Sequence, residues 1–170
     1  MEKRNVTVSA IVAAIVLIGD QLSKHWAETW LRTNGEYKIW DGVLHLRYVE
    51  NRGAAFGMMQ GGKWFFLAIT GIACAAMLYF LIKERKRLHF MMTFSIALLL
   101  SGAIGNLIDR VALGYVRDMI YVALIDFAVF NVADMAVTVG CCLLVLDLLF
   151  FKGKKHMEMM DKKPQTGENS

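Results

Sequence analysis

The sequence predicts an α-helical membrane protein with four transmembrane helices and a small sheet on one membrane surface. Of its 170 residues, 56% are apolar, and the mean hydropathy is +0.43. Four long stretches carry almost no charge, and basic clusters lie next to them. This length suits one domain, expected over 1–155, with spans at about 6–28, 64–82, 90–108 and 132–151.

The first span is the shortest in apolar length. Its uncharged part, 6–19, covers only about 21 Å of a core about 30 Å thick. The chain continues as DQLSKHWAETWL, without glycine or proline, and Asp20, Lys24 and Glu28 are spaced four apart. Such residues share one helical face and leave the other for lipid. Because three more spans follow, we expect an uncleaved helix rather than a secretory signal.

The other three spans reach the length of about 20 residues that a crossing needs. The third contains Ser101, Gly102 and Gly105, small residues that favour close helix contact. The fourth is interrupted only by Asp134 and Asp147. The three cysteines lie within apolar stretches without metal-ligand spacing, so they are expected to pack in the core or against lipid.

Basic residues set the expected orientation. KERKR (83–87), KGKK (152–155) and the N-terminal Lys3–Arg4 place both termini in the cytoplasm by the positive-inside rule. Segments 29–63 and 109–131 then face outward, and 156–170 form a polar cytoplasmic tail expected to be disordered. The net charge of +4 therefore reflects topology and contact with anionic phospholipid, not nucleic-acid binding.

The outer segments predict short strands. Partial alternation between Ile39 and Val49, interrupted by Asp41–Gly42, indicates a hairpin, and 114–122 is rich in β-branched and aromatic residues. The glycine-rich stretch 50–62 suits a tight turn, with a short interfacial helix as the alternative. We therefore expect a small sheet lying on the outer membrane surface.

Polar residues gather at the outer ends of the spans, where a carboxylate near the bilayer core costs roughly 2.5–3.5 kcal/mol. Asp147 lies about 20 Å deeper than Asp134 along a helix and cannot join this group. The residues at this level are Asp20, Lys24, Asn106, Asp109, Arg110, Asn131 and Asp134, with Asn51, Arg52 and Asp118 approaching from the outer segments.

Each of these residues also has a structural explanation. Asp20 and Lys24 can form a buried pair that locks helices together, and Asp109 can pair locally. Asn131 suits a helix N-cap, with Asp134 in the first turn. The convergence of so many polar groups at one level nevertheless favours a site.

The residue types narrow the chemistry. GxSxG and HExxH are absent, and the histidines are scattered, so no metal or organic cofactor is expected. Two aspartates that share one proton can activate water and protonate a leaving amine, which hydrolyses a peptide without a covalent intermediate. Spacing alone leaves several pairs open among Asp20, Asp109, Asp118, Asp126 and Asp134.

Five blocks in order resemble the lipoprotein signal peptidases, the type II signal peptidases of bacterial membranes. They are DQLSK (20–24), ENRGAAFG (50–57), GAIGNLIDR (102–110), VRD (116–118) and FNVAD (130–134). The resemblance covers about residues 15–150. It implies four spans, an extracytoplasmic β-cradle and an aspartyl endopeptidase that cuts prolipoproteins just before a diacylglyceryl-modified cysteine.

The resemblance also implies residue roles. Asp118 and Asp134 are the expected catalytic pair, and the residues that shape the site or bind substrate are Asp20, Asn51, Asn106, Arg110 and Asn131. The expected enzyme is monomeric, lies in the inner membrane among phospholipids and has its site at the extracytoplasmic interface. Two features depart from the pattern: Arg117, a cation that favours an ionised Asp118, and a 121–131 connection without tryptophan or proline.

Two other functions compete. An ion-path or transport protein would use Asp20, Asp134 and Asp147, although the last two lie on different helical faces. An assembly scaffold would use the same charges only to lock helices, and mutation of either aspartate would then remove folded protein rather than turnover.

Overall fold

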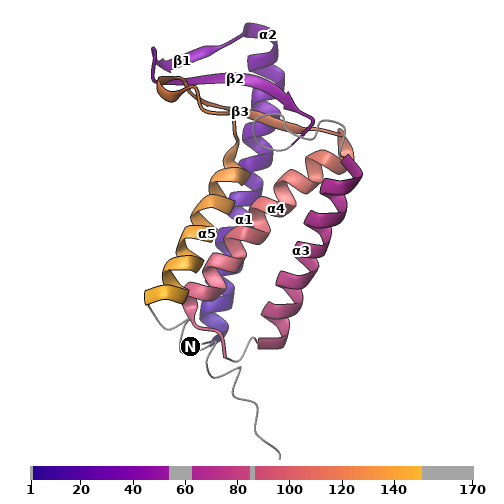
Figure 1. Cartoon of the computed structure of the whole chain (residues 1–170), viewed down its shortest axis with the longest axis vertical. Coiled ribbons are helices and arrows are strands. Elements are labelled where there is room, and N and C mark those ends of the chain that lie inside the picture. The colour runs from indigo at the N-terminus through magenta and orange to yellow at the C-terminus, as the bar shows by residue number, and fades with distance from the viewer. Residues whose placement is uncertain (1, 54–62, 85–86, 151–170) are drawn as a thin grey trace, which may run out of the picture.

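The computed structural model describes residues 2–53, 63–84 and 87–150 and confirms the predicted fold class (Figure 1). Four of the helices in this part of the chain are long and apolar enough to cross a membrane. They are α1 (Glu2–Trp26), α3 (Lys63–Glu84), α4 (Phe90–Ala112) and α5 (Val132–Phe150), and a sheet of β1 (Tyr37–Trp40), β2 (Leu44–Asn51) and β3 (Val116–Val122) lies at one end of them.

Helix α4 lies at the centre of the bundle, between α1, α5 and α3 (Figure 1). The predicted small-residue contact is present on its outer half. A Cβ atom added to Gly102 would lie 2.3 Å from the carbonyl oxygen of Ala133, so α4 and α5 touch backbone to backbone there. Nearer the other end, Met92, Ile96 and Leu100 form a buried apolar cluster with Cys74 of α3.

The first helix runs further than the sequence predicts. After α1, a π-helical turn η1 (Ala27–Leu31) and a short helix α2 (Arg32–Asn34) continue the same rod past residue 28. Ala27 and Leu31 are buried against Met119 of β3. The predicted span ended at about residue 28, whereas the sheet packs on the extension and buries its apolar side.

The sheet is antiparallel in the order β1-β2-β3 and confirms both predicted strand regions. β1 and β2 form a hairpin whose turn includes Gly42, at φ +72°. β2 pairs with β3 so that Val49 lies opposite Asp118 and Asn51 opposite Val116. The predicted turn or interfacial helix within 50–62 falls mostly at 54–62, and the predicted tail at 156–170; both lie outside the described residues.

The connection after β3 turns back onto the sheet. A 3₁₀ turn η3 (Ala123–Ile125) leads to Asp126, which has a left-handed φ of +48°. Phe130 then exchanges two backbone hydrogen bonds with Ile120, at 2.8 and 3.0 Å. This return places Asn131 and the first turn of α5 beside β3, although the segment lacks the residues expected from the family pattern.

Candidate active site

Asp118 of β3 and Asp134 of α5 both line one cavity of about 550 Å³, at the junction of the sheet and the outer helix ends. Asn51, Asn106 and Arg110 also line it. Its remaining wall is mainly apolar and comes from the segment before α5 and from the outer turns of that helix. Six of the seven predicted site residues thus line this cavity or bond to residues that line it. The seventh, Asp20, bonds instead to the N-terminal turn of α5.

The N-terminus of α5 fixes Asp134. The side chain of Asn131 accepts a hydrogen bond from the backbone N–H of Asp134 at 3.0 Å. The carboxylate of Asp134 accepts in return from the backbone N–H of Asn131 at 3.1 Å. This reciprocal pair is a capping box, which confirms the predicted N-cap and holds a negative charge at the positive end of the helix dipole.

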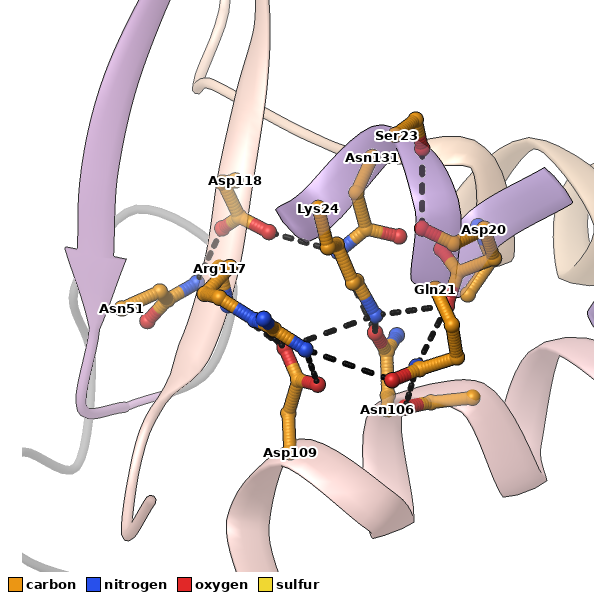
Figure 2. Close-up of polar contacts among 12 residues, drawn as sticks. Asp20, Gln21, Ser23, Lys24, Asn51, Asn106, Asp109, Arg117, Asp118 and Asn131 are labelled. Carbon is orange, nitrogen blue, oxygen red and sulfur yellow. Dashed lines mark hydrogen bonds and ion pairs between the residues drawn. The ribbon is translucent and has the colours of Figure 1, made fainter. Parts of the chain in front are cut away.

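Asn131 also joins the two aspartates. Because its Oδ1 accepts from a backbone N–H, its amide nitrogen must donate, and it donates to Oδ1 of Asp118 at 2.6 Å. Asn51 donates to the other oxygen of Asp118 at 3.0 Å (Figure 2). The Asp118 side chain is 2% exposed. Burial and the nearby charge of Asp134 raise the pKa of the Asp118 carboxyl to about 7.

Lys24 sets the orientation of Asn106. Its ammonium group is fully buried and donates to Oδ1 of Asn106 at 2.8 Å (Figure 2). An ammonium can only donate, so the amide nitrogen of Asn106 must face the other way. It donates to Oδ1 of Asp134 at 2.7 Å. One buried cation therefore determines how the amide meets the carboxylate.

Asp20 does not line the cavity, and its contacts are with the helix that carries Asp134. Its Oδ1 accepts the backbone N–H of Ala133, a first-turn group of α5 that has no partner within its own helix, at 2.9 Å. Its Oδ2 lies 2.9 Å from the ammonium of Lys24. The predicted site-shaping role thus corresponds to anchoring α5 on α1.

Arg117 points away from Asp118, because neighbouring residues of a strand face opposite sides. Its guanidinium donates to the carboxylate of Asp109 and to the side chain of Gln21 (Figure 2). It also donates to Glu28 at 2.9 Å. These acceptors raise the pKa of Arg117 and keep it charged. The local pairing expected for Asp109 is formed with Arg117. Arg117 was expected to favour an ionised Asp118, but its guanidinium is instead paired with Asp109 and Glu28.

Arg110 lies at the cavity wall with its guanidinium 5.1 Å from the centre of the Phe66 ring. It forms no hydrogen bond or ion pair with residues 2–53, 63–84 or 87–150, and its charge acts on both Asp118 and Asp134. Its donors therefore face the cavity without a partner in the described chain. This suits a carbonyl or anionic group of a bound molecule.

Two contributors, Lys24 and Arg117, were given no site role from the sequence. Lys24 was expected only as the buried i,i+4 partner of Asp20, and that pair is present. Nothing in the local sequence pattern points to the partners of Arg117, which come from distant segments. Asp147 bonds to His89 at 2.8 Å, at the opposite end of α5 from Asp134, as its position predicts.

No group of three or more His, Cys, Asp or Glu side chains that could hold a metal ion occurs in the part of the chain that the structure describes. The absence of metal and cofactor remains a prediction. The arrangement itself offers two carboxyl groups tied to one asparagine, unpaired arginine donors and an apolar wall.

The comparisons with known proteins agree with this geometry. The family model described as Signal peptidase (SPase) II matches residues 12–150. Lipoprotein signal peptidase of Streptococcus thermophilus (strain CNRZ 1066) is 46% identical over 142 residues, covering 83% of this chain and 92% of the relative. That of Clostridioides difficile (strain 630) is 44% identical over 145 residues, covering 85% and 97%. A bacterial membrane enzyme solved by the in meso method at 2.3 Å resolution is 32% identical, covers 95% of both chains and superposes with a TM-score of 0.78.

Proposed function

The chain belongs to the signal peptidase II family of aspartic peptidases, and we propose that Asp118 and Asp134 are the catalytic pair with which it cleaves the signal peptide from prolipoproteins. The observation that supports this pair is their shared link through Asn131. The side-chain amide of Asn131 donates a hydrogen bond to Asp118, and Asn131 also exchanges two hydrogen bonds with Asp134.

The two carboxyl groups take different roles. Asp134 sits at a helix N-terminus and accepts two N–H groups, and we assign it the role of the base for water. Asp118, with its pKa at about 7, carries the proton that polarises the scissile carbonyl. As water attacks, its proton passes to Asp134 while Asp118 gives its proton to the carbonyl oxygen. Asp134 then donates the proton it received to the leaving amine, Asp118 regains a proton from the tetrahedral intermediate, and the C–N bond breaks.

The apolar wall of the cavity suits the remainder of the substrate. The cavity follows α5 from Asp134 past Met135 to Val139, within a candidate membrane span. Hydrophobic residues of a signal peptide and the acyl chains of a diacylglyceryl group bind there without entering water. The substrate is therefore a prolipoprotein already lipidated on the cysteine that follows the cut.

The membrane setting forms part of the same proposal. The chain is a membrane protein with four apolar helices, and we place it in the bacterial inner membrane with both termini in the cytoplasm. The catalytic pair then lies at the extracytoplasmic interface. The enzyme works as a monomer surrounded by phospholipid and needs neither metal nor organic cofactor.

The test is cleavage of a diacylglyceryl-modified precursor and its unlipidated twin in proteoliposomes. Asp118→Asn and Asp134→Asn should each lower turnover by at least about 10³-fold, as loss of a member of a catalytic unit does. Asp41→Asn, a matched change in the exposed β1–β2 turn, should leave turnover unchanged. Full activity in either catalytic variant would reject the pair.

Folding must be followed in the same samples. A scaffold whose charges only lock helices would lose folded protein in the Asp118 and Asp134 variants, whereas a catalytic pair loses turnover in protein that still unfolds at or above the wild-type temperature. Ion flux in the absence of peptide cleavage would instead favour a transport function.

A further inference from the structure

A second cavity, of about 360 Å³, opens on the other side of Asp118. It lies between β2 and the segment 126–129. The two cavities share Asn51, Asp118 and residues 127–129 as lining. Asp118 therefore faces two compartments that meet at its carboxyl group.

The two compartments differ chemically. The first is bounded largely by apolar side chains of α5, inside a candidate span. The second lies outside the spanning helices, and its wall includes the charged residues Arg47, Glu50, Arg52 and Asp126. An acyl chain gains nothing from charged walls, whereas a polar polypeptide can bond to them.

Among the charged residues of this second cavity, Arg47 forms no ion pair with residues 2–53, 63–84 or 87–150. Its guanidinium lies 3.9 Å from the centre of the Tyr121 ring, which fixes its position. Its Nε is buried and has no hydrogen-bond partner among the described residues. The nearby acids are engaged elsewhere: Glu50 with Arg32 and Arg52, and Asp126 with the hydroxyl of Tyr121.

From this geometry we infer that the second cavity binds the part of the substrate that follows the modified cysteine, with Arg47 selecting for an acidic residue. The inference rests on the proposed function, since it needs the scissile bond at Asp118. The apolar signal peptide and the acyl chains of the modified cysteine occupy the first cavity, and the polar residues that follow the cysteine enter the second, charged cavity.

The strand geometry indicates which substrate residue Arg47 would contact. Val49 lies opposite Asp118, and Arg47 is two residues further along β2, where the pairing with β3 is irregular between Leu46 and Val49; two residues span at most about 7 Å of strand. An extended peptide leaving Asp118 covers that distance in about two residues. Arg47 should therefore contact one of the two residues after the cysteine.

The experiment compares lipidated precursors that carry Asp, Ser or Lys at those two positions, cleaved by purified full-length enzyme in proteoliposomes. The wild type should cleave the Asp precursor about tenfold better than the Lys precursor in kcat/KM, since a charge-assisted hydrogen bond contributes about that much. Arg47→Gln should bring the ratio within about twofold, and Arg47→Glu should reverse it. Lys38→Gln removes a cation that lies outside this cavity on β1 and should keep the wild-type ratio.

Other outcomes would overturn the inference. An unchanged Asp/Lys ratio in both Arg47 variants would do so, as would an equal change in the Lys38 control. A change in dependence on anionic phospholipid, without a change in the ratio, would assign Arg47 to a lipid phosphate instead. Because the ratio compares two substrates on the same preparation, partial misfolding of a variant does not move it. If the wild type cleaves no lipidated precursor, the proposed function fails, not the subsite alone.

Discussion

Arg117 contacts both carboxylate oxygens of Asp109, through Nη2 at 2.8 Å and Nε at 3.1 Å, while its backbone N–H donates to the same carboxylate at 3.0 Å. The Asp109 side chain is completely buried. This bidentate pair ties β3 to the outer end of α4, immediately before Asp118 in the chain. The position of β3, which carries Asp118, therefore depends on this buried ion pair.

Replacing Arg117 with Val should destabilise the protein strongly. The change removes both guanidinium bonds from the buried Asp109 carboxylate and leaves it the backbone N–H of residue 117, at 3.0 Å, and the ammonium of Lys24, at 3.7 Å. Breaking a buried pair costs about 3–5 kcal/mol, which chemical or thermal unfolding in detergent would measure. The double variant Arg117→Val, Asp109→Ala should lose less than the sum of the single changes, because it leaves no orphaned charge. Purely additive losses would show that the two residues are not coupled.

A surface cation provides the control for that cycle. Arg52 is 66% exposed and pairs with Glu50, so Arg52→Gln should change the unfolding free energy by less than about 1 kcal/mol. A loss as large as that of Arg117→Val would mean that net charge, rather than the buried pair, determines stability.

Activity should fall as the pH rises through about 7. The Asp118 carboxyl has its pKa near that value, and the shared proton is lost above it. kcat/KM should then drop about tenfold per pH unit on the alkaline side. The unfolding temperature must be measured at each pH in parallel. This separates a fall in activity caused by unfolding from one caused by deprotonation of Asp118. A flat profile up to pH 9 would contradict the assignment of the acid to Asp118.

The same carboxyl should lower stability at neutral pH. Its pKa is about 7 in the folded protein, against 3.8 for an aspartate side chain in the unfolded chain. Between these values the folded state binds more protons than the unfolded state, so the free energy of unfolding decreases as pH rises. Asp118→Asn removes this effect and should stabilise the protein at pH 7.5 by about 1–2 kcal/mol, typical for relieving a strained active site.

The pH dependence of that gain is its control. At pH 4 the Asp118 carboxyl is largely protonated in the folded protein. The stability advantage of Asp118→Asn should therefore shrink toward zero. A gain of the same size at both pH values would indicate a packing effect of the amide rather than removal of a buried charge.

Sequence patterns were sufficient for the parts of the fold that depend on local physics. Span length follows from the thickness of the bilayer, and strand alternation from the two faces of a sheet. The capping role of Asn131 before Asp134 was visible because N-cap chemistry acts over three residues. Spacing alone could not choose the catalytic pair; motif resemblance to a family supplied Asp118 and Asp134.

Contacts between distant segments could not be predicted in this way. The orientation of Asn106 depends on Lys24, 82 positions earlier in the chain. Whether the Arg117 side chain points toward α4 depends on which face of β3 packs against that helix. The length of the first helical rod depends on the sheet that covers Ala27 and Leu31. Each requires the tertiary arrangement, because the local sequence is compatible with the opposite outcome.

Gly105→Ala should uncouple the first helix from the catalytic helix. A Cβ atom at this position would lie 2.6 Å from Oδ2 of Asp20, the carboxylate whose other oxygen caps Ala133 in the first turn of α5. Moving Asp20 away leaves that buried N–H without its acceptor and shifts the turn that carries Asp134. We expect a loss of about 1–3 kcal/mol in stability from overpacking, together with a fall in kcat in the fraction that stays folded.

Gly71→Ala is the matched control for this change, because nothing lies within 4 Å of a Cβ atom at that position of α3. It should be neutral or slightly stabilising, since alanine favours a helix more than glycine does. The two variants differ only in what the added methyl group meets. If Gly105→Ala keeps both wild-type stability and kcat, Asp20 can move without cost, and its bond to Ala133 does not position the catalytic turn.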